Sequence, residues 1–319
     1  MTCTTSDTAV SDFPWGNTAL RIKTGGDRVK PKDYDLIFSE KSCIISIGYP
    51  NGKKVEYMKK FEGMLLCSDW DGTLFRKEVI NEEDRAAISY FEENGGMFTV
   101  CSGRYRDFLS QYAHLIRPNT YLITLNGAII VHPDTGKVLY EGFLDTDVIP
   151  VLRNILHMGI PYSTVLLYRR GASECETYDA QDFQKIENEL ENDRFYKILL
   201  RTDTPENGER GARMAQAYLG GKFEASRSWE TSLEIMKEEN NKGHAILRLK
   251  EAVGAHTVIA VGDYENDISM LRTADISYAV GGAPDFVKRF ADYVTVPLSE
   301  CPMAHIISEL ENKIGEIKV

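Results

Sequence analysis

The stretch Met64-Leu-Leu-Cys-Ser-Asp-Trp-Asp-Gly-Thr73 decides the fold, because an apolar run leads directly into two carboxylates and a turn. The run from Met64 to Ser68 predicts a buried strand, and Asp69 and Asp71 follow where that strand should end. The glycine and threonine after them are residues that turn a chain. In open α/β sheets, ligands bind at the carboxyl ends of the strands. We therefore expect the two carboxylates to belong to a ligand site at such an end.

Two carboxylates one residue apart suit phosphoryl transfer. One can attack phosphorus and form an aspartyl-phosphate, which divides a difficult hydrolysis into two easier steps. The other can protonate the leaving oxygen and then deprotonate the attacking water. Because two anions repel an anionic phosphate, the site needs a hard divalent cation with oxygen ligands, for which Mg²⁺ is the first choice. The plainer alternative is an Asp-x-Asp pair that only begins a turn.

Three later segments place further polar groups beside expected strand ends or helix starts. Phe98–Cys101 predicts a second strand that runs into Ser102-Gly103-Arg104. Asn241-Lys242-Gly243 precedes a helical pattern and supplies a cation. Thr257–Val261 predicts a third strand, which ends in Gly262-Asp263-Tyr-Glu-Asn266-Asp267. Taken singly, each segment could be a helix cap or a solvated charge, but their order along the chain favours one common site.

In this order the motifs resemble those of phosphatases of the haloacid dehalogenase superfamily, specifically the Cof-type branch with an inserted C2-type cap domain. The match consists of four motifs in sequence: Asp-x-Asp-Gly-Thr at 69–73, Ser-Gly-Arg at 102–104, Lys-Gly at 242–243 and Gly-Asp-x-x-Asn-Asp at 262–267. The likeness runs from about residue 61 to the C-terminus. It departs from the family pattern at Gly281–Pro284 and Ser299–Met303, and neither departure removes a catalytic group.

The resemblance implies a role for each matching residue. Asp69 would be the nucleophile and Asp71 the general acid and base. Mg²⁺ would be bound by Asp69, by the main-chain carbonyl of Asp71 and by Asp263. Asp267 would orient the metal site or the nearby lysine without binding the ion itself. The phosphoryl oxygens would be held by four residues of the later motifs: Ser102, Gly103, Lys242 and Asn266.

The resemblance also implies an α/β fold with a Rossmann-like parallel-sheet core and an inserted smaller α/β cap domain. The core is expected from residues 58–144 and 234–319, and the cap from 145–233, where the texture of the sequence changes. Residues 1–57 precede the likeness and are expected to be an N-terminal extension. This segment is either a loose tail with a hairpin built on Ile44–Ile47 and Lys54–Tyr57 or an artefact of start-site assignment.

Composition limits the partners. The formal charge of −11 over 319 residues argues against a general nucleic-acid binder, which would carry a basic surface. The six cysteines are scattered without Cys-x-x-Cys spacing, which favours free thiols in a reducing compartment. The sequence has neither a signal-peptide pattern nor an apolar stretch long enough to span a bilayer. We expect a cytoplasmic protein that acts on a small phosphorylated molecule, and the sequence leaves its oligomeric state open.

Several local features have two interpretations. Asn81 can cap a helix, and the spacing of Leu109, Tyr112 and Ile116 predicts another helix. In the cap, the spacing of Met214, Ala217 and Leu219 predicts a further one. Asn126-Gly127 after the strand Tyr121–Leu125 is favoured as a hairpin turn over a direct substrate contact. Four cap residues could face a substrate or form a solvated rim: Tyr168, Arg169, Arg170 and Arg201.

Three classes of function are compatible with these motifs. The first is a magnesium-dependent phosphatase of small phosphorylated metabolites such as sugar phosphates. The second is a phosphotransferase or mutase that passes the phosphoryl group from the same aspartyl-phosphate to another hydroxyl. The third is a non-catalytic sensor of a phosphorylated metabolite. Because Asp69 and Asp71 are both present, the sequence favours catalysis, and Asp71 is available to activate water.

Overall fold

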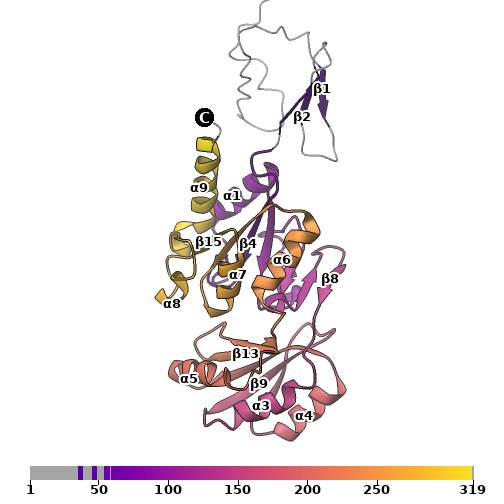
Figure 1. Cartoon of the computed structure of the whole chain (residues 1–319), viewed down its shortest axis with the longest axis vertical. Helices are drawn as coiled ribbons and strands as arrows, with labels where there is room; N and C mark the ends of the chain where they lie inside the picture. The colour runs from indigo at the N-terminus through magenta and orange to yellow at the C-terminus, as the bar shows by residue number, and fades with distance from the viewer. Residues whose placement is uncertain (1–34, 39–44, 49–53, 58, 318–319) are drawn as a thin grey trace, which may run out of the picture. The chain divides into compact units, whose positions relative to one another are not determined.

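The computed structural model describes residues 35–38, 45–48, 54–57 and 59–317 (Figure 1). The chain divides into two compact units, Met1–Met58 and Lys59–Val319. In the first unit, β1 (Asp35–Phe38), β2 (Ile45–Gly48) and β3 (Lys54–Tyr57) form an antiparallel sheet in that order. The β2–β3 pair is the predicted hairpin. Its turn at 50–53 and the tail through residue 33 lie outside the described residues.

An eight-stranded sheet forms the centre of the second unit, in the order β16-β15-β14-β4-β5-β6-β7-β8. The strands from β16 to β6 are parallel, whereas β7 and β8 are antiparallel to their neighbours. The six strands that run in parallel are β4 (Met64–Asp69), β5 (Met97–Cys101), β6 (Leu122–Thr124), β14 (Thr257–Gly262), β15 (Ile276–Ala279) and β16 (Tyr293–Val294). The other two are β7 (Ile129–Val131) and β8 (Val138–Glu141). The three predicted strands are therefore neighbours, with β4 between β14 and β5.

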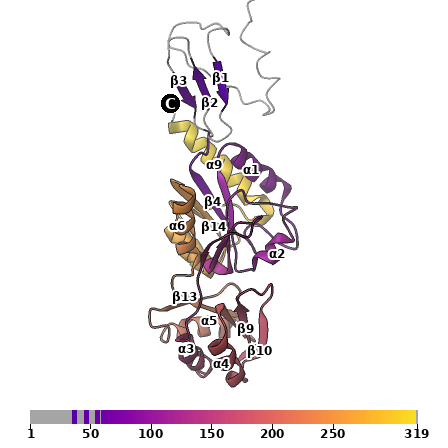
Figure 2. The same ribbon diagram turned by 90° about the vertical axis from the view of Figure 1, so that its right-hand side faces the viewer.

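Helices cover both faces of this sheet (Figure 2). On one face lie α1 (Glu82–Glu93), α2 (Arg106–Ser110) and α9 (Pro302–Ile317), and on the other lie α6 (Lys242–Val253) and α7 (Ile268–Thr273). Leu66 of β4 packs under the first group, while Leu65 and Cys67 pack under the second. A strand buried on both faces reads as a continuous apolar run, which is why the sequence before Asp69 is uniformly apolar.

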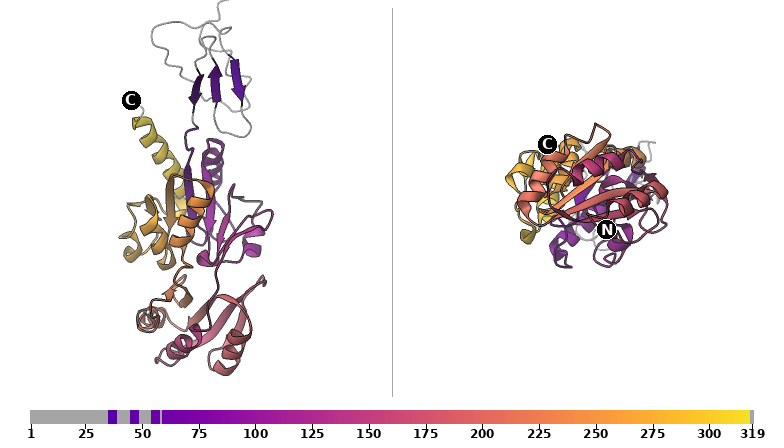
Figure 3. Two further views of the ribbon diagram at one scale, coloured as in Figure 1. Left: turned by 45° about the vertical axis from the view of Figure 1, so that its right-hand side comes forward. Right: turned by 90° about the horizontal axis from the view of Figure 1, so that it is seen from below.

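A second sheet belongs to the inserted α/β cap domain. Its five strands are antiparallel, in the order β10-β9-β11-β13-β12. They are β9 (Tyr162–Arg169), β10 (Glu176–Asp179), β11 (Phe195–Thr202), β12 (Phe223–Ser226) and β13 (Ser232–Lys237). One face packs under α3 (Val148–Leu156), α4 (Phe183–Asn192) and α5 (Pro205–Ala215), as Figure 3 shows. The predicted fold class, a parallel-sheet core with a smaller α/β cap, is confirmed.

Short elements complete the second unit. They are α8 (Asp285–Lys288) and three single-turn 3-10 helices, η1 (Leu125–Gly127), η2 (Glu265–Asp267) and η3 (Leu298–Glu300). Among the helices of the described residues, none combines the length and the apolar character needed to cross a bilayer. The four described cysteines are free, and two of them, Cys67 and Cys101, are buried in β4 and β5.

Three local expectations about helices need correction. Asn81 precedes α1 as predicted, but its side chain donates to the carbonyl of Leu298 (2.7 Å) instead of capping the helix. The helix predicted through Ile116 ends at Ser110, because Tyr112 turns back to pack on Trp70 and Phe75. In the cap, α5 ends at Ala215, Ala217 lies in the turn that follows it, and Leu219 lies just after that turn.

The turn at Asn126-Gly127 is confirmed. It lies in η1 between the antiparallel strands β6 and β7, with Thr124 opposite Ile129. Asn126 and Gly127 both have positive φ, of 56° and 105°, which asparagine and glycine tolerate best. A Cβ atom on Gly127 would lie 2.5 Å from the carbonyl oxygen of Asn241. The turn can therefore approach the start of α6 only because this residue is glycine.

Candidate active site

A buried ion pair network joins the ends of three segments that are distant in sequence. The Nζ atom of Lys242, the first residue of α6, lies 2.5 Å from Oδ1 of Asp69 and 2.6 Å from Oδ1 of Asp267. The side chains of Lys242 and Asp267 are fully buried, and that of Asp69 is 7 % exposed. Burial alone would lower the pKa of Lys242, but Asp267 and Asp69 raise it overall. The lysine therefore stays charged between two carboxylates.

The carboxylates also interact with one another. Burial is the largest effect that raises the pKa of Asp69, and the charge of Asp267 raises it further, while Lys242 acts in the opposite direction. Burial and Asp267 together raise the pKa of Asp263 to about 7. In the contacts described here, Lys242 is the only cation beside the three carboxylates of Asp69, Asp263 and Asp267. A site of this kind favours a bound cation.

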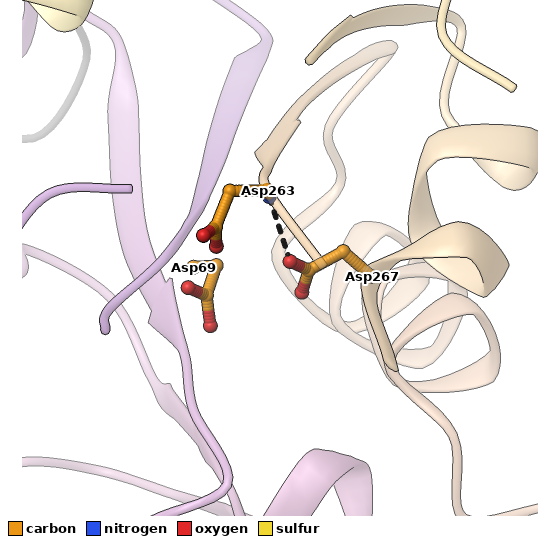
Figure 4. Close-up of side chains that lie close together, drawn as sticks. All are labelled: Asp69, Asp263 and Asp267. Atoms are coloured by element: carbon orange, nitrogen blue, oxygen red, sulfur yellow. Dashed lines mark hydrogen bonds between the residues drawn. The ribbon is translucent and has the colours of Figure 1, made fainter. Parts of the chain in front are cut away.

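Asp263 and Asp267 follow β14, and hydrogen bonds fix both side chains. Oδ1 of Asp263 accepts from the hydroxyl of Thr73 (3.0 Å). Oδ2 of Asp267 accepts from the main-chain N–H groups of Asp263 (2.9 Å) and Tyr264 (3.0 Å), while its Oδ1 accepts from Lys242. Figure 4 shows these carboxyl groups with Asp69 between β4 and the loop after β14. Asp267 therefore uses both of its oxygens to hold the loop and the lysine.

The donor set fits a hard divalent cation. Carboxylate oxygens of Asp69, Asp263 and Asp267 lie within 4.8 Å of one another. In the contacts described above, Asp267 accepts from three N–H groups, whereas Asp69 accepts one hydrogen bond from Lys242 and Asp263 accepts one from the hydroxyl of Thr73. A Cβ atom on Gly72 would collide with Oδ2 of Asp263, so glycine keeps this space open. Oxygen ligands around such a space are what Mg²⁺ requires.

The side chain of Asp71 lies apart from this cluster. It is 46 % exposed, and Arg104 binds both of its oxygens, from Nε at 2.9 Å and from Nη2 at 3.1 Å. The guanidinium of Arg104 also lies over the ring of Phe108, at 4.6 Å. The sequence motif Ser-Gly-Arg includes Arg104, but its contact with Asp71 was not predicted.

Besides Lys242, the residues predicted to bind phosphate are Ser102 and Gly103, in the loop after β5, and Asn266, in η2. Ser102 is fully buried, and its Oγ accepts from the main-chain N–H of Arg104 (3.1 Å). The N–H of Asn126 donates to the carbonyl of Ser102 (2.9 Å), and the side chain of Asn126 accepts from Nδ2 of Asn266 (3.2 Å). A Cβ atom on Gly103 would lie 3.1 Å from Oδ1 of Asn126. These contacts bring Ser102, Gly103 and Asn266 together around Asn126.

Three of the four cap side chains that could face a substrate have other partners. Arg169 forms ion pairs with three carboxylates, those of Glu176, Glu189 and Asp193, so its charge is already neutralised within the cap. Arg170 pairs with Glu141, and Arg201 is exposed. Tyr168 stacks on Tyr105 of the core, with 5.4 Å between the ring centroids. Two buried charged residues of the cap, Lys197 and Glu234, could not be predicted from the sequence pattern.

The chain is similar in sequence to known hydrolases. The sequence profile of the haloacid dehalogenase-like hydrolases matches residues 66–307. The chain belongs to this family. Among its relatives in Bacillus subtilis (strain 168) is the 5-amino-6-(5-phospho-D-ribitylamino)uracil phosphatase YcsE. The two are 30% identical over 237 residues, which cover 72% of this chain and 89% of the relative. The phosphatase YwpJ of the same organism is 24% identical over 284 residues, covering 77% of this chain and 99% of the relative.

Solved structures of this family share the fold. A haloacid dehalogenase-like hydrolase from B. subtilis matches with a TM-score of 0.64 at 24% identity, over 77% of this chain and 99% of that chain. A sugar phosphatase of haloacid dehalogenase subclass IIB matches with a TM-score of 0.63 at 20% identity, over 79% and 99%. The resemblance to Cof-type phosphatases is confirmed, and the enzyme class is that of a phosphoric monoester hydrolase.

Proposed function

We propose that this protein is a magnesium-dependent phosphatase that removes phosphate from small phosphorylated metabolites through an aspartyl-phosphate on Asp69. One observation carries the proposal: Asp69 lies at the end of β4 beside a buried lysine and two further carboxylates. A nucleophile, a cation for the phosphate and ligands for a metal ion are thus within reach of one another. Phosphoryl transfer depends mainly on such positioning and charge stabilisation.

The proposed reaction has two steps. A carboxylate oxygen of Asp69 forms a bond to phosphorus while the bond to the substrate oxygen breaks, and Asp71 gives its proton to that leaving oxygen. Water then attacks the phosphorus of the aspartyl-phosphate, Asp71 takes up a proton from the water, and the bond to Asp69 breaks. Each cycle consumes one water molecule and releases one alcohol and one phosphate, and both aspartates return to their starting states.

The remaining site residues are proposed to stabilise the charge of the transferring group. Four of them would donate hydrogen bonds to its oxygens: Ser102, Gly103, Lys242 and Asn266. Asp267 would keep Lys242 in place by accepting a hydrogen bond from its Nζ atom. Asp69, the main-chain carbonyl of Asp71 and Asp263 would hold Mg²⁺, which neutralises negative charge on the phosphate when it is bound.

The cap is proposed to exclude water and to select the leaving group. We propose a core of residues 58–144 and 234–319, a cap of 145–233 and an N-terminal extension of 1–57. The second of these boundaries falls inside the strand β13 (Ser232–Lys237). Because this strand pairs along its length within the cap sheet, its residues, Glu234 included, are counted with the cap. Domain variants should therefore be cut after Lys237, where the sheet pairing has ended.

A panel of phosphorylated metabolites tests the proposed function. It should include sugar phosphates, phosphoglycolate and 5-amino-6-(5-phospho-D-ribitylamino)uracil, because relatives of this chain are named for the last two compounds. We expect inorganic phosphate to be released from at least one small alkyl phosphate. Transfer of the phosphoryl group to a second hydroxyl would favour a phosphotransferase instead. Binding without turnover across the panel would favour a sensor.

Removal of the metal ion should abolish activity. We expect excess EDTA to stop phosphate release, Mg²⁺ to restore it and Ca²⁺ to restore it poorly. The reason is that Ca²⁺ accepts longer and more numerous contacts, which would misalign the attack on phosphorus. Added Mg²⁺ should also raise the melting temperature of the metal-free protein, since a ligand that binds the folded state stabilises it. Full turnover in excess EDTA would contradict the proposed metal dependence.

A further inference from the structure

Two charged residues of the cap are buried on the face of its sheet that is turned away from its helices. Along β11 and β13, Ile198, Leu200 and Ile235 pack into the core of the cap. Because side chains alternate along a strand, Lys197 and Glu234 point to the opposite face. Both are only 1 % exposed. Buried charges cost several kcal/mol of desolvation unless good partners offset that cost, so their contacts need an explanation.

Those contacts reach the loops of the catalytic core. Nζ of Lys197 donates to Oε1 of Glu234 (3.0 Å) and to the carbonyl oxygen of Gly103 (2.9 Å). It also lies over the ring of Tyr168, at 4.3 Å. Glu234 accepts from the hydroxyl of Ser228 (2.7 Å) and from Nδ2 of Asn126. The cap pair therefore holds Gly103 with one member and Asn126 with the other.

The contact of Lys197 with Gly103 acts on Ser102. The carbonyl of Gly103 and the N–H of Arg104 belong to one peptide group. Lys197 binds its oxygen, and its N–H donates to Oγ of Ser102 (3.1 Å). Because Oγ of the buried Ser102 accepts this hydrogen bond, its own hydroxyl proton can point towards a phosphoryl oxygen. Lys197 thus fixes the peptide group that sets the orientation of this hydroxyl.

The contact of Glu234 acts on Asn266 in a similar way. A carboxylate only accepts hydrogen bonds, so Glu234 requires the NH₂ group of Asn126 to face it. The carbonyl oxygen of the Asn126 amide then faces Nδ2 of Asn266 and accepts from it (3.2 Å). One carboxylate of the cap therefore fixes the orientation of two successive amides, the second of which is proposed to bind phosphate.

From this arrangement we propose that Lys197 and Glu234 are positioning residues, through which the cap orients Ser102 and Asn266 for phosphate binding. The proposal rests on the proposed phosphatase function and adds a link between cap and chemistry. When the cap is on the core, the phosphate donors are set. When it leaves, the peptide group after Gly103 and the amide of Asn126 lose their partners. Closure of the cap and assembly of the phosphate site become one event.

A double-mutant cycle tests this link. We expect Lys197→Met to lower kcat on para-nitrophenyl phosphate by about 10-fold to 100-fold, somewhat less than removal of an oxyanion donor itself. In the Ser102→Ala background the same change should lower kcat by less than about 3-fold, because the hydroxyl that Lys197 orients is already absent. Lys197→Met should also weaken inhibition by inorganic phosphate. Equal factors in both backgrounds would overturn the proposal. Lys222→Met, which removes an exposed cap lysine paired with Asp147, serves as the matched control and should behave like wild type.

A second variant separates positioning from folding. Lys197→Met leaves Glu234 buried without its cation, which by itself can destabilise the protein. In Lys197→Met/Glu234→Met neither charge of this pair remains, and thermal unfolding should return towards wild type while kcat and phosphate affinity stay low. If the double variant regains activity together with stability, the pair serves only to hold the cap together. If wild type releases phosphate and Lys197→Met is unimpaired, this inference fails while the proposed function stands.

Discussion

Asp69→Asn is expected to abolish turnover and phosphoenzyme formation while leaving the fold intact. An amide has nearly the size of the carboxylate, and its oxygen can still accept from Lys242, which lies 2.5 Å from Asp69. It is a poor nucleophile and a weaker ligand for Mg²⁺, so both functions proposed for Asp69 are lost together. Loss of a nucleophile should cost about 10⁴-fold or more in kcat. The melting temperature should not fall, because one of several mutually repelling buried carboxylates becomes neutral.

Three measurements decide this prediction: phosphate release, acid-quench trapping of labelled phosphoenzyme and thermal unfolding. Asp285→Asn is a suitable control, since that side chain is fully exposed and lies outside the site. We expect it to retain wild-type values in all three. Residual turnover of Asp69→Asn above a few per cent, with deamidation excluded by mass spectrometry, would place the nucleophile elsewhere. A collapsed fold would leave Asp69→Glu as the next variant, in which the carboxylate is kept but displaced by one methylene.

The sequence predicted the core of the site because its signals are local. An apolar run beside a polar motif predicts a buried strand and its end, so the positions of Asp69, Ser102 and Asp263 after β4, β5 and β14 could be read without the structure. Adjacency of these three strands then places their ends together. The strand-end rule by itself predicts only a ligand site, and the expectation of a phosphatase fold came from the resemblance of the four motifs to those of haloacid dehalogenase-superfamily phosphatases.

Contacts between distant segments could not be read in this way. Arg104 and Asp71 are 33 residues apart, and Asn126 and Glu234 are 108 apart, with no spacing that relates them. Arg169 remained a candidate for a substrate contact because the carboxylates that surround it come from two other segments of the cap, β10 and the C-terminal end of α4. The helix expected around Tyr112 failed for a similar reason, since aromatic packing against Trp70 and Phe75 outweighs helical spacing.

Asp71→Asn is expected to impair two substrates unequally. If Asp71 protonates the leaving oxygen, the rate of turnover should fall most with a sugar phosphate, by about 10²-fold to 10⁴-fold, because an alkoxide leaves poorly without its proton. With para-nitrophenyl phosphate the rate of the first step should fall less, since its phenolate leaves unaided. The second step also needs Asp71 to deprotonate water. Phosphoenzyme should therefore accumulate with the activated substrate and become visible after an acid quench.

The position of Asp71 makes this comparison informative. Arg104 binds both of its oxygens in this structure, so the carboxyl group must turn away from the guanidinium to meet a leaving group. Asp107→Asn, an exposed carboxylate beside Arg106, is the matched control and should affect neither substrate. Wild-type rates on both substrates would mean that Asp71 contributes only its main-chain carbonyl and that its side chain serves to hold Arg104. An equal loss on both would point to disturbed metal binding or a shared slow second step. Only a change in the ratio of the two rates assigns the proton transfer to Asp71.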